Sequence, residues 1–109
     1  MSASIVQPQS PADIRDRFQR LAQEWKEKSR FLSNTAQMAL LRPYQAIIGM
    51  GMPVIPLILE ELRREPDQWF WALEAITEEN PVRSEDAGNV PKMAKAWIDW
   101  GCQRGLVKS

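Results

Sequence analysis

Prolines in this chain recur at positions where helices would begin, and this spacing limits the fold more than any other feature of the sequence. Pro11, Pro43, Pro53 and Pro66 each precede a stretch of helical length with apolar residues along one side. Proline fits the first turn of a helix but breaks a helix interior or a central strand. No four residues between turn signals alternate apolar and polar side chains as a half-buried strand does. The sequence therefore predicts an all-α fold, a compact array of five or six helices.

The first helix is predicted to span residues 11–31. Ser10 can cap it, and the proline that follows fits its first position. Its apolar residues recur at steps of four, three and four, which places Ile14, Phe18, Leu21 and Trp25 on one stripe. Such a stripe can pack on the other helices of its own chain, pair with the same helix of a second copy in a homodimer, or lie in a partner's groove. We expect it to pack within the chain.

The remaining segments are expected to belong to one helical domain, residues 10–109. A short helix is predicted over residues 36–41 after a cap within residues 33–35. Arg42 is expected outside a helix, because the residue before a proline disfavours the helical conformation. The domain continues with a repeat-like core (43–79), a loop (80–89) and a C-terminal helix (90–105), and a flexible leader (1–9) precedes it.

Length and composition indicate a single protein domain with no membrane-spanning segment. The chain has 109 residues, which suffices for one domain and not for two. Cys102 is its one cysteine, so no disulfide can form within the chain. The longest apolar stretch, 46–59, is interrupted by glycines and prolines and is shorter than the ~18 residues that a membrane span needs. We expect a cytoplasmic protein without a membrane partner.

The lack of histidine argues against catalysis. It removes Ser-His and Cys-His nucleophile pairs, histidine general bases and most zinc sites. Cys102 alone cannot bind a structural metal and is expected to be a small apolar residue of the core. Glu74 and Glu78 could serve an enzyme that uses carboxylates alone, but pairs of this spacing are ordinary on a solvated helix surface. We expect no enzyme activity, no cofactor and no metal, and a carboxylate-only enzyme or enzyme subunit is the least favoured alternative.

Three consecutive aromatic residues, 69–71, stand out among the five tryptophans, one tyrosine and three phenylalanines of the chain. Neighbouring positions on a helix point about 100° apart, so at least one of the three rings must leave the core side. Pro66 is expected to open this helix, with Trp69 in the core. Trp25 and Trp97 are also expected in the core. Trp71 either packs against the tryptophans of the C-terminal helix or lies exposed as an anchor for a partner.

Tryptophan, tyrosine and arginine dominate the energetics of protein interfaces, which guides the choice of binding residues. Trp71 falls on the predicted helix side of Glu74 and Glu78, with Arg64 as a candidate neighbour. Trp100 follows the core residue Trp97 by three positions and could face either way. Arg42 and Tyr44 flank a proline, where the tyrosine hydroxyl either bonds a backbone carbonyl at a helix junction or contacts a partner. The candidate protein-binding residues are therefore Arg42, Tyr44, Arg64, Trp71, Glu74 and Trp100.

The charges balance overall but divide unevenly along the chain. The net charge is +3 over residues 1–42, −6 over residues 43–86 and +3 over residues 87–109. This asymmetry can steer a charged partner. The first helix carries its basic residues around its circumference, at Arg15, Arg17, Arg20, Lys26, Lys28 and Arg30. Because DNA-binding domains concentrate such residues on one face, a nucleic-acid-associated regulator is an alternative and not the first interpretation.

Two resemblances accompany these patterns. Residues 47–81, a helix that ends in glycine, a proline-led helix and a third helix rich in Ala and Leu, resemble a HEAT-type repeat. HEAT repeats stack antiparallel helix pairs into scaffolds that bind other molecules. Residues 43–105 also resemble a group of small bacterial proteins of unassigned function, through the blocks PYQAIIGMG (43–51), WFWAL (69–73), NPV (80–82) and AWIDWG (96–101). The second likeness implies no activity.

These observations together favour a non-catalytic module that binds another protein. The resemblance to HEAT-type scaffolds and the surplus of tryptophan point in the same direction. We expect an adaptor, an inhibitor or an antitoxin-like partner protein.

Overall fold

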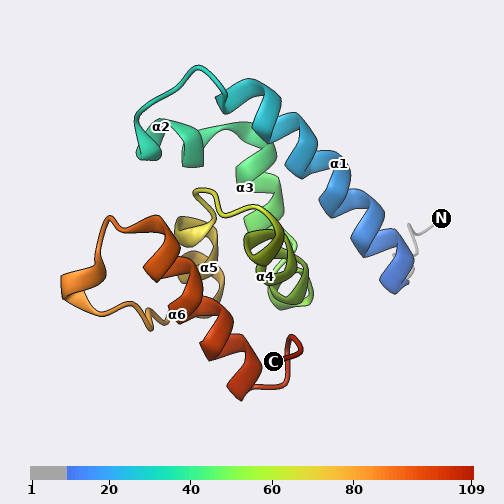
Figure 1. Cartoon of the computed structure of the whole chain (residues 1–109). Helices are drawn as coiled ribbons and strands as arrows, with labels where there is room; N and C mark the ends of the chain where they lie inside the picture. Colours follow the sequence, from blue (N-terminus) through green and yellow to red (C-terminus); the bar gives the residue numbers. More distant parts are fainter. Residues whose placement is uncertain (1–9) are drawn as a thin grey trace, which may run out of the picture.

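The computed structural model describes residues 10–109, and the leader expected at residues 1–9 lies outside the described part. Within it the chain forms six α-helices and two 3-10 turns and no strand, which confirms the all-α prediction (Figure 1). The elements in chain order are α1 (Pro11–Ser29), α2 (Thr35–Leu40), α3 (Arg42–Gly49), η1 (Met52–Val54), α4 (Ile55–Arg64), α5 (Phe70–Thr77), η2 (Ser84–Asp86) and α6 (Val90–Gln103).

Side chains cap three of the helices at the places that the sequence predicts. The Ser10 hydroxyl accepts a hydrogen bond from the backbone amide of Asp13, and the Ser10 amide donates one to the Asp13 carboxylate, so α1 begins with a capping box. Asn34 caps α2 and Asn89 caps α6, each through a 3.1 Å bond from an amide three residues on. These bonds satisfy helix-terminal amides that no carbonyl of the same helix can reach.

Some predicted boundaries are wrong by a few residues. Helix α1 ends at Ser29 and not at residue 31. The break between α2 and α3 falls on Leu41, which is extended with ψ 143°, whereas Arg42 is helical and forms the first residue of α3. The preference of a residue before proline for extended backbone is a tendency, and here the helix starts one residue earlier than the rule predicts.

The predicted start of the fifth helix is also wrong. Residues 66–69 lie outside the helix, which begins at Phe70. The Asp67 side chain accepts a bond from the amide of Gln68 at 2.7 Å, and the Asp67 carbonyl accepts one from the amide of Trp69 at 2.8 Å. Short bonds between an aspartate and the backbone next to it compete with helix formation. The local turn delays the helix, and Trp69 enters the core from just before it.

The three central helices α3, α4 and α5 lie between α1 and α6 (Figure 1). The stripe on α1 packs inward, with Phe18 and Trp25 buried and Ile14 and Leu21 partly buried against the core. This confirms the expected packing within the chain.

Aromatic rings fill the centre between α1, α3 and the start of α5. The ring centroid of Trp25 lies 4.6 Å from that of Trp69 and 5.2 Å from that of Tyr44, and Phe18 lies 5.7 Å from Trp69. Trp25, Trp69 and Trp97 are fully buried, as the sequence predicts. Rings in tilted pairs at these separations add to the stabilisation that burial alone gives.

The chain turns by 107° between α3 and the segment formed by η1 and α4. Gly51 adopts a positive φ of 73° at this turn, a conformation that other residues rarely adopt. Among the described residues, no single helix combines the length and the apolar composition that crossing a membrane requires.

Candidate functional site

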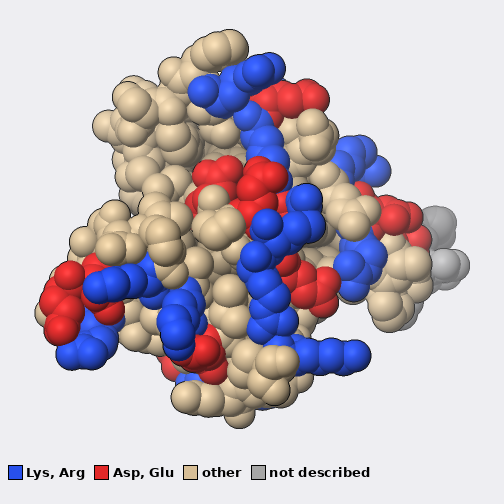
Figure 2. All heavy atoms as spheres, viewed as in Figure 1, with Lys and Arg blue, Asp and Glu red and all other residues tan. Residues whose placement is uncertain are grey.

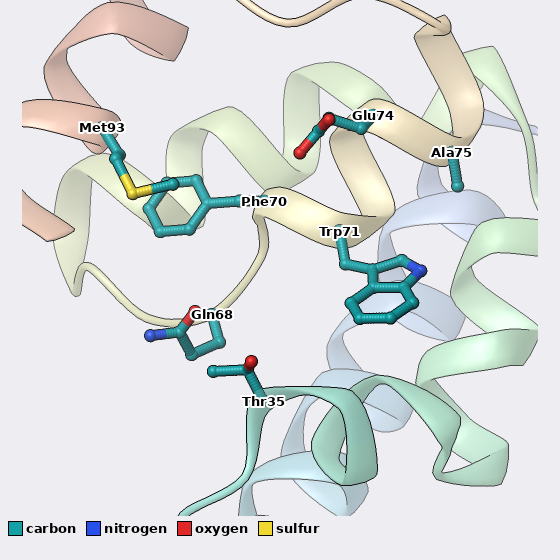
Figure 3. Close-up of a pocket in the computed structure, with 7 residues that line it drawn as sticks. All are labelled: Thr35, Gln68, Phe70, Trp71, Glu74, Ala75 and Met93. Carbon is teal, nitrogen blue, oxygen red and sulfur yellow. The ribbon is translucent and has the colours of Figure 1, made fainter. Parts of the chain in front are cut away.

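A groove of about 460 Å³ opens between the start of α2, the segment before α5, α5 itself and α6 (Figure 3). We call it the α2–α5 groove. Its walls are largely apolar and carry one carboxylate. The lining residues are Thr35, Gln68, Phe70, Trp71, Glu74, Ala75 and Met93.

Trp71 is the exposed tryptophan of the described chain. Its residue surface is 48% exposed, whereas the other four tryptophans are buried. Figure 3 shows its ring extending from α5 toward α2 at one side of the groove. Of the two positions that the sequence left open for Trp71, the packed one is therefore wrong and the exposed one is confirmed. Exposed indole surface of this size is what protein interfaces use as an anchor.

Glu74 joins Trp71 on the same groove, as their spacing on the helix predicts. No basic side chain of residues 10–109 forms an ion pair with Glu74. Arg64, expected as a neighbour, instead lies at the end of α4 and pairs with Glu61 at 2.6 Å, on a surface that it shares with α1. Arg42 is exposed at the start of α3 and is not among the residues that line the groove.

Tyr44 is fully buried, so it has no surface to offer a partner. Its hydroxyl donates to the carbonyl of Gln68 at 2.9 Å and accepts from the amide of Ala72 at 2.9 Å. Burial raises the pKa of the Tyr44 hydroxyl well above its ordinary value, and the nearby carboxylates of Asp67 and Glu74 raise it further. The residue is a neutral structural link between α3 and α5, as the helix-junction alternative predicts.

Trp100 is 6% exposed, and the prediction that it binds a partner directly is not supported by its position. Its indole donates to Glu79 Oε1 at 3.1 Å, and the guanidinium of Arg104 lies 4.4 Å from the ring centroid. Arg104 also pairs with Glu79 at 2.9 Å. The ring is covered because the chain supplies both a carboxylate and a cation to it.

The sequence analysis missed the apolar corner beside the groove. Residues 31–41 carry no charged side chain, and Phe31 and Leu40 are 88% and 68% exposed there. The area over α2 in Figure 2 accordingly lacks Lys, Arg, Asp and Glu atoms. A run of eleven uncharged residues was the available signal. A short helix with exposed leucine and phenylalanine is the kind of surface that another protein covers.

The basic residues of α1 are partly balanced by carboxylates. Arg15 pairs with Glu60 at 3.4 Å, and Lys26 pairs with Glu61 and, at 3.4 Å, with Glu65. In Figure 2 blue and red atoms lie side by side along this helix. These pairs reduce the positive field that phosphate binding requires.

The paired carboxylates considered for catalysis do not share a helix face. Glu74 lies within α5, but Glu78 follows its end in the left-handed conformation, with φ 58°. No three His, Cys, Asp or Glu side chains of residues 10–109 converge in a way that could hold a metal ion. Cys102 is partly buried in α6, where its thiol lies 3.5 Å from the carbonyl of Lys108.

Comparisons of the chain with family models, with curated proteins and with solved structures give no match.

Proposed function

We propose that this chain is a cytoplasmic, non-catalytic protein-binding module, an adaptor, inhibitor or antitoxin-like partner, that binds through the α2–α5 groove and the apolar corner of residues 31–41. One observation carries the proposal. Trp71 is about half exposed on a chain that buries its other four tryptophans. Leaving a large apolar ring in water forgoes the stabilisation that burial gives, and interfaces concentrate their binding energy on such rings.

The surroundings of Trp71 support the proposal. Phe31 and Leu40 add exposed apolar surface on the uncharged residues 31–41, whose helix α2 contributes Thr35 to the groove. An apolar centre with a polar rim is the usual composition of an interface between proteins. The HEAT-type helix order expected for residues 47–81 is part of the same proposal, since such units serve as binding scaffolds.

The test compares the wild-type chain with two alanine variants as bait in a lysate of the source cells, at low and at high salt. Trp71→Ala removes the exposed ring of the groove. Met52→Ala is the matched control, because Met52 is 52% exposed but lies in η1 and is not one of the residues that line the groove. We expect one protein in stoichiometric amount with wild type and Met52→Ala, retained at high salt, and its loss with Trp71→Ala.

Two other results would contradict the proposal. Equal recovery with wild type and Trp71→Ala would show that the groove does not bind the partner. Nucleic acid recovered at low salt and lost at high salt would favour the alternative of a nucleic-acid-associated regulator, because counterion release makes phosphate binding steeply dependent on salt.

A further inference from the structure

The α2–α5 groove carries an acidic group that the chain itself does not neutralise. Glu74 forms no ion pair within residues 10–109; Glu27 and Glu78 also form none, but of these three only Glu74 lines the groove. Asp67, which also forms no ion pair there, directly precedes the groove residue Gln68. Neither carboxylate is paired with a basic side chain of residues 10–109, so both are free to attract a basic group of a ligand.

Asp67 and Glu74 both act on the hydroxyl of Tyr44. Both Asp67 and Glu74 raise the pKa of the Tyr44 hydroxyl, beyond the larger effect of burial. Tyr44 bonds to Gln68 and Ala72, which belong to the segment that forms the groove wall. Two negative charges therefore act on the side of this wall that faces Tyr44, and their fields add.

The aromatic walls suit a basic side chain better than a purely apolar one. Phe70 and Trp71 flank the groove and Met93 closes it from α6 (Figure 3). Arginine and lysine bury their aliphatic stems on such surfaces while the charged end turns toward a carboxylate or an aromatic ring. Glu74 lies at the edge of this space in Figure 3, where it can receive that charged end.

Elsewhere in the fold, a tryptophan and a glutamate are joined by an arginine of the same chain. On the far end of α6, Arg104 lies over the Trp100 ring at 4.4 Å and pairs with Glu79 at 2.9 Å. There the chain supplies tryptophan, glutamate and arginine together. At the groove it supplies Trp71 and Glu74, and the cation is missing among the described residues.

We propose, on the premise that the chain is a protein-binding module, that the α2–α5 groove binds a segment of the partner protein that carries an arginine or lysine beside an apolar residue. The basic side chain pairs with Glu74, and the apolar residue packs on the exposed ring of Trp71.

A random twelve-residue peptide library displayed on phage tests this proposal with the full chain as bait. Peptides enriched on wild type over Trp71→Ala are sequenced, and the strongest is synthesised for titration. We expect arginine or lysine next to an apolar residue in the enriched set. We expect Glu74→Gln, which keeps the size of the side chain, to lower the affinity for the synthetic peptide about 10-fold. This is the usual effect of losing a charge-assisted hydrogen bond.

Asp16→Asn is the matched control, since Asp16 is an exposed acid on α1 away from the groove residues. Its affinity for the peptide should equal that of wild type. Enriched peptides without basic residues, or unchanged affinity in Glu74→Gln with binding lost in Trp71→Ala, would overturn the basic-partner proposal and leave the protein-binding function standing. If no peptide distinguishes wild type from Trp71→Ala, the groove does not bind a linear basic segment and this proposal falls, whereas the protein-binding function is decided by the lysate experiment.

Discussion

The hydroxyl of Tyr44 accepts a hydrogen bond from the backbone amide of Ala72, 2.9 Å away, and thereby caps α5 from a different helix. Ala72 is the third residue of α5, where an amide has no carbonyl partner within its own helix. Trp69 precedes the helix and supplies no side-chain cap. A tyrosine 28 residues earlier in the chain does so instead, and its proton goes to the carbonyl of Gln68.

Tyr44→Phe should therefore lower the free energy of unfolding by about 1–3 kcal/mol, because it leaves a buried amide and a carbonyl without partners. Urea unfolding followed by circular dichroism measures the change. Lys95→Gln is the control, since it breaks an exposed pair with Asp99 and should leave the free energy of unfolding close to that of wild type. Equal stability of Tyr44→Phe and wild type would show that the ring alone, and not the hydroxyl, stabilises the junction.

The contact between α4 and α6 depends on the absence of a side chain at Gly101. A Cβ atom there would lie 2.5 Å from Leu59 Cδ1 and 3.2 Å from Val107 Cγ2, and Leu59 is fully buried. We expect Gly101→Ala to destabilise the fold, because overpacking of a closed core costs about 1–3 kcal/mol and outweighs the gain in helix propensity.

Gly49→Ala is the matched substitution with the opposite expected sign. Gly49 ends α3, and a Cβ atom there meets nothing within 4 Å. Alanine should stabilise the chain by up to about 1 kcal/mol by restricting the unfolded state. The pair is compared by thermal unfolding, and a stabilising Gly101→Ala would mean that α4 and α6 pack less closely than the structure shows.

What the sequence could predict rests on local patterns. Two kinds of feature depend only on residues close together in the sequence, the helix caps and the apolar stripe of α1. The structure confirms the stripe and the caps Ser10, Asn34 and Asn89. The inward position of Trp69 is also confirmed. The helix expected around it is wrong at its start, because the bonds of Asp67 to its neighbours replace the first turn.

The site was harder to predict because exposure depends on partners that are distant in sequence. Trp100 and Trp71 are equally ambiguous by spacing. Trp100 is covered because Glu79, 21 residues earlier, lies within reach of its indole, whereas Trp71 has no such partner and half of its surface stays open. Periodicity indicates which side of a helix faces inward but not which neighbour covers a residue at the border.

Ion pairs between α1 and α4 should make stability depend on pH in the acid range. Glu61 is 13% exposed and binds both Lys26 and Arg64. Burial by itself raises the pKa of the Glu61 carboxyl, but the hydrogen bonds from Arg64 and Lys26 outweigh burial and hold the pKa below its usual value. Because the folded state favours the charged form of Glu61, its contribution to the free energy of unfolding is complete above about pH 5. That contribution is lost as the pH falls through the lowered pKa.

Glu61→Gln should accordingly lower the free energy of unfolding by about 1–2 kcal/mol at pH 7. The difference in unfolding free energy between the variant and wild type should shrink below about pH 4. Urea titrations at pH 7, 5, 4 and 3 measure this. Glu60→Gln is the matched control on the next residue, because Glu60 and Arg15 are both about half exposed and their pair contributes little. A Glu61→Gln difference that stays constant with pH would contradict the assigned ion pairs.

Trp71 and Trp69 stand two residues apart and should respond in opposite ways to removal of the ring. Trp71→Ala exposes no core and should change the free energy of unfolding by no more than about 0.5 kcal/mol, the usual range for surface positions. Trp69→Ala empties the centre of the aromatic cluster and should cost about 3–5 kcal/mol. Fluorescence gives an independent measure, since acrylamide reaches exposed indoles first. Trp71→Phe should therefore remove most of the quenchable emission, whereas Trp100→Phe should leave it in place. If instead Trp71→Ala proves as destabilising as Trp69→Ala, the ring is part of the core and the groove cannot use it to hold a partner.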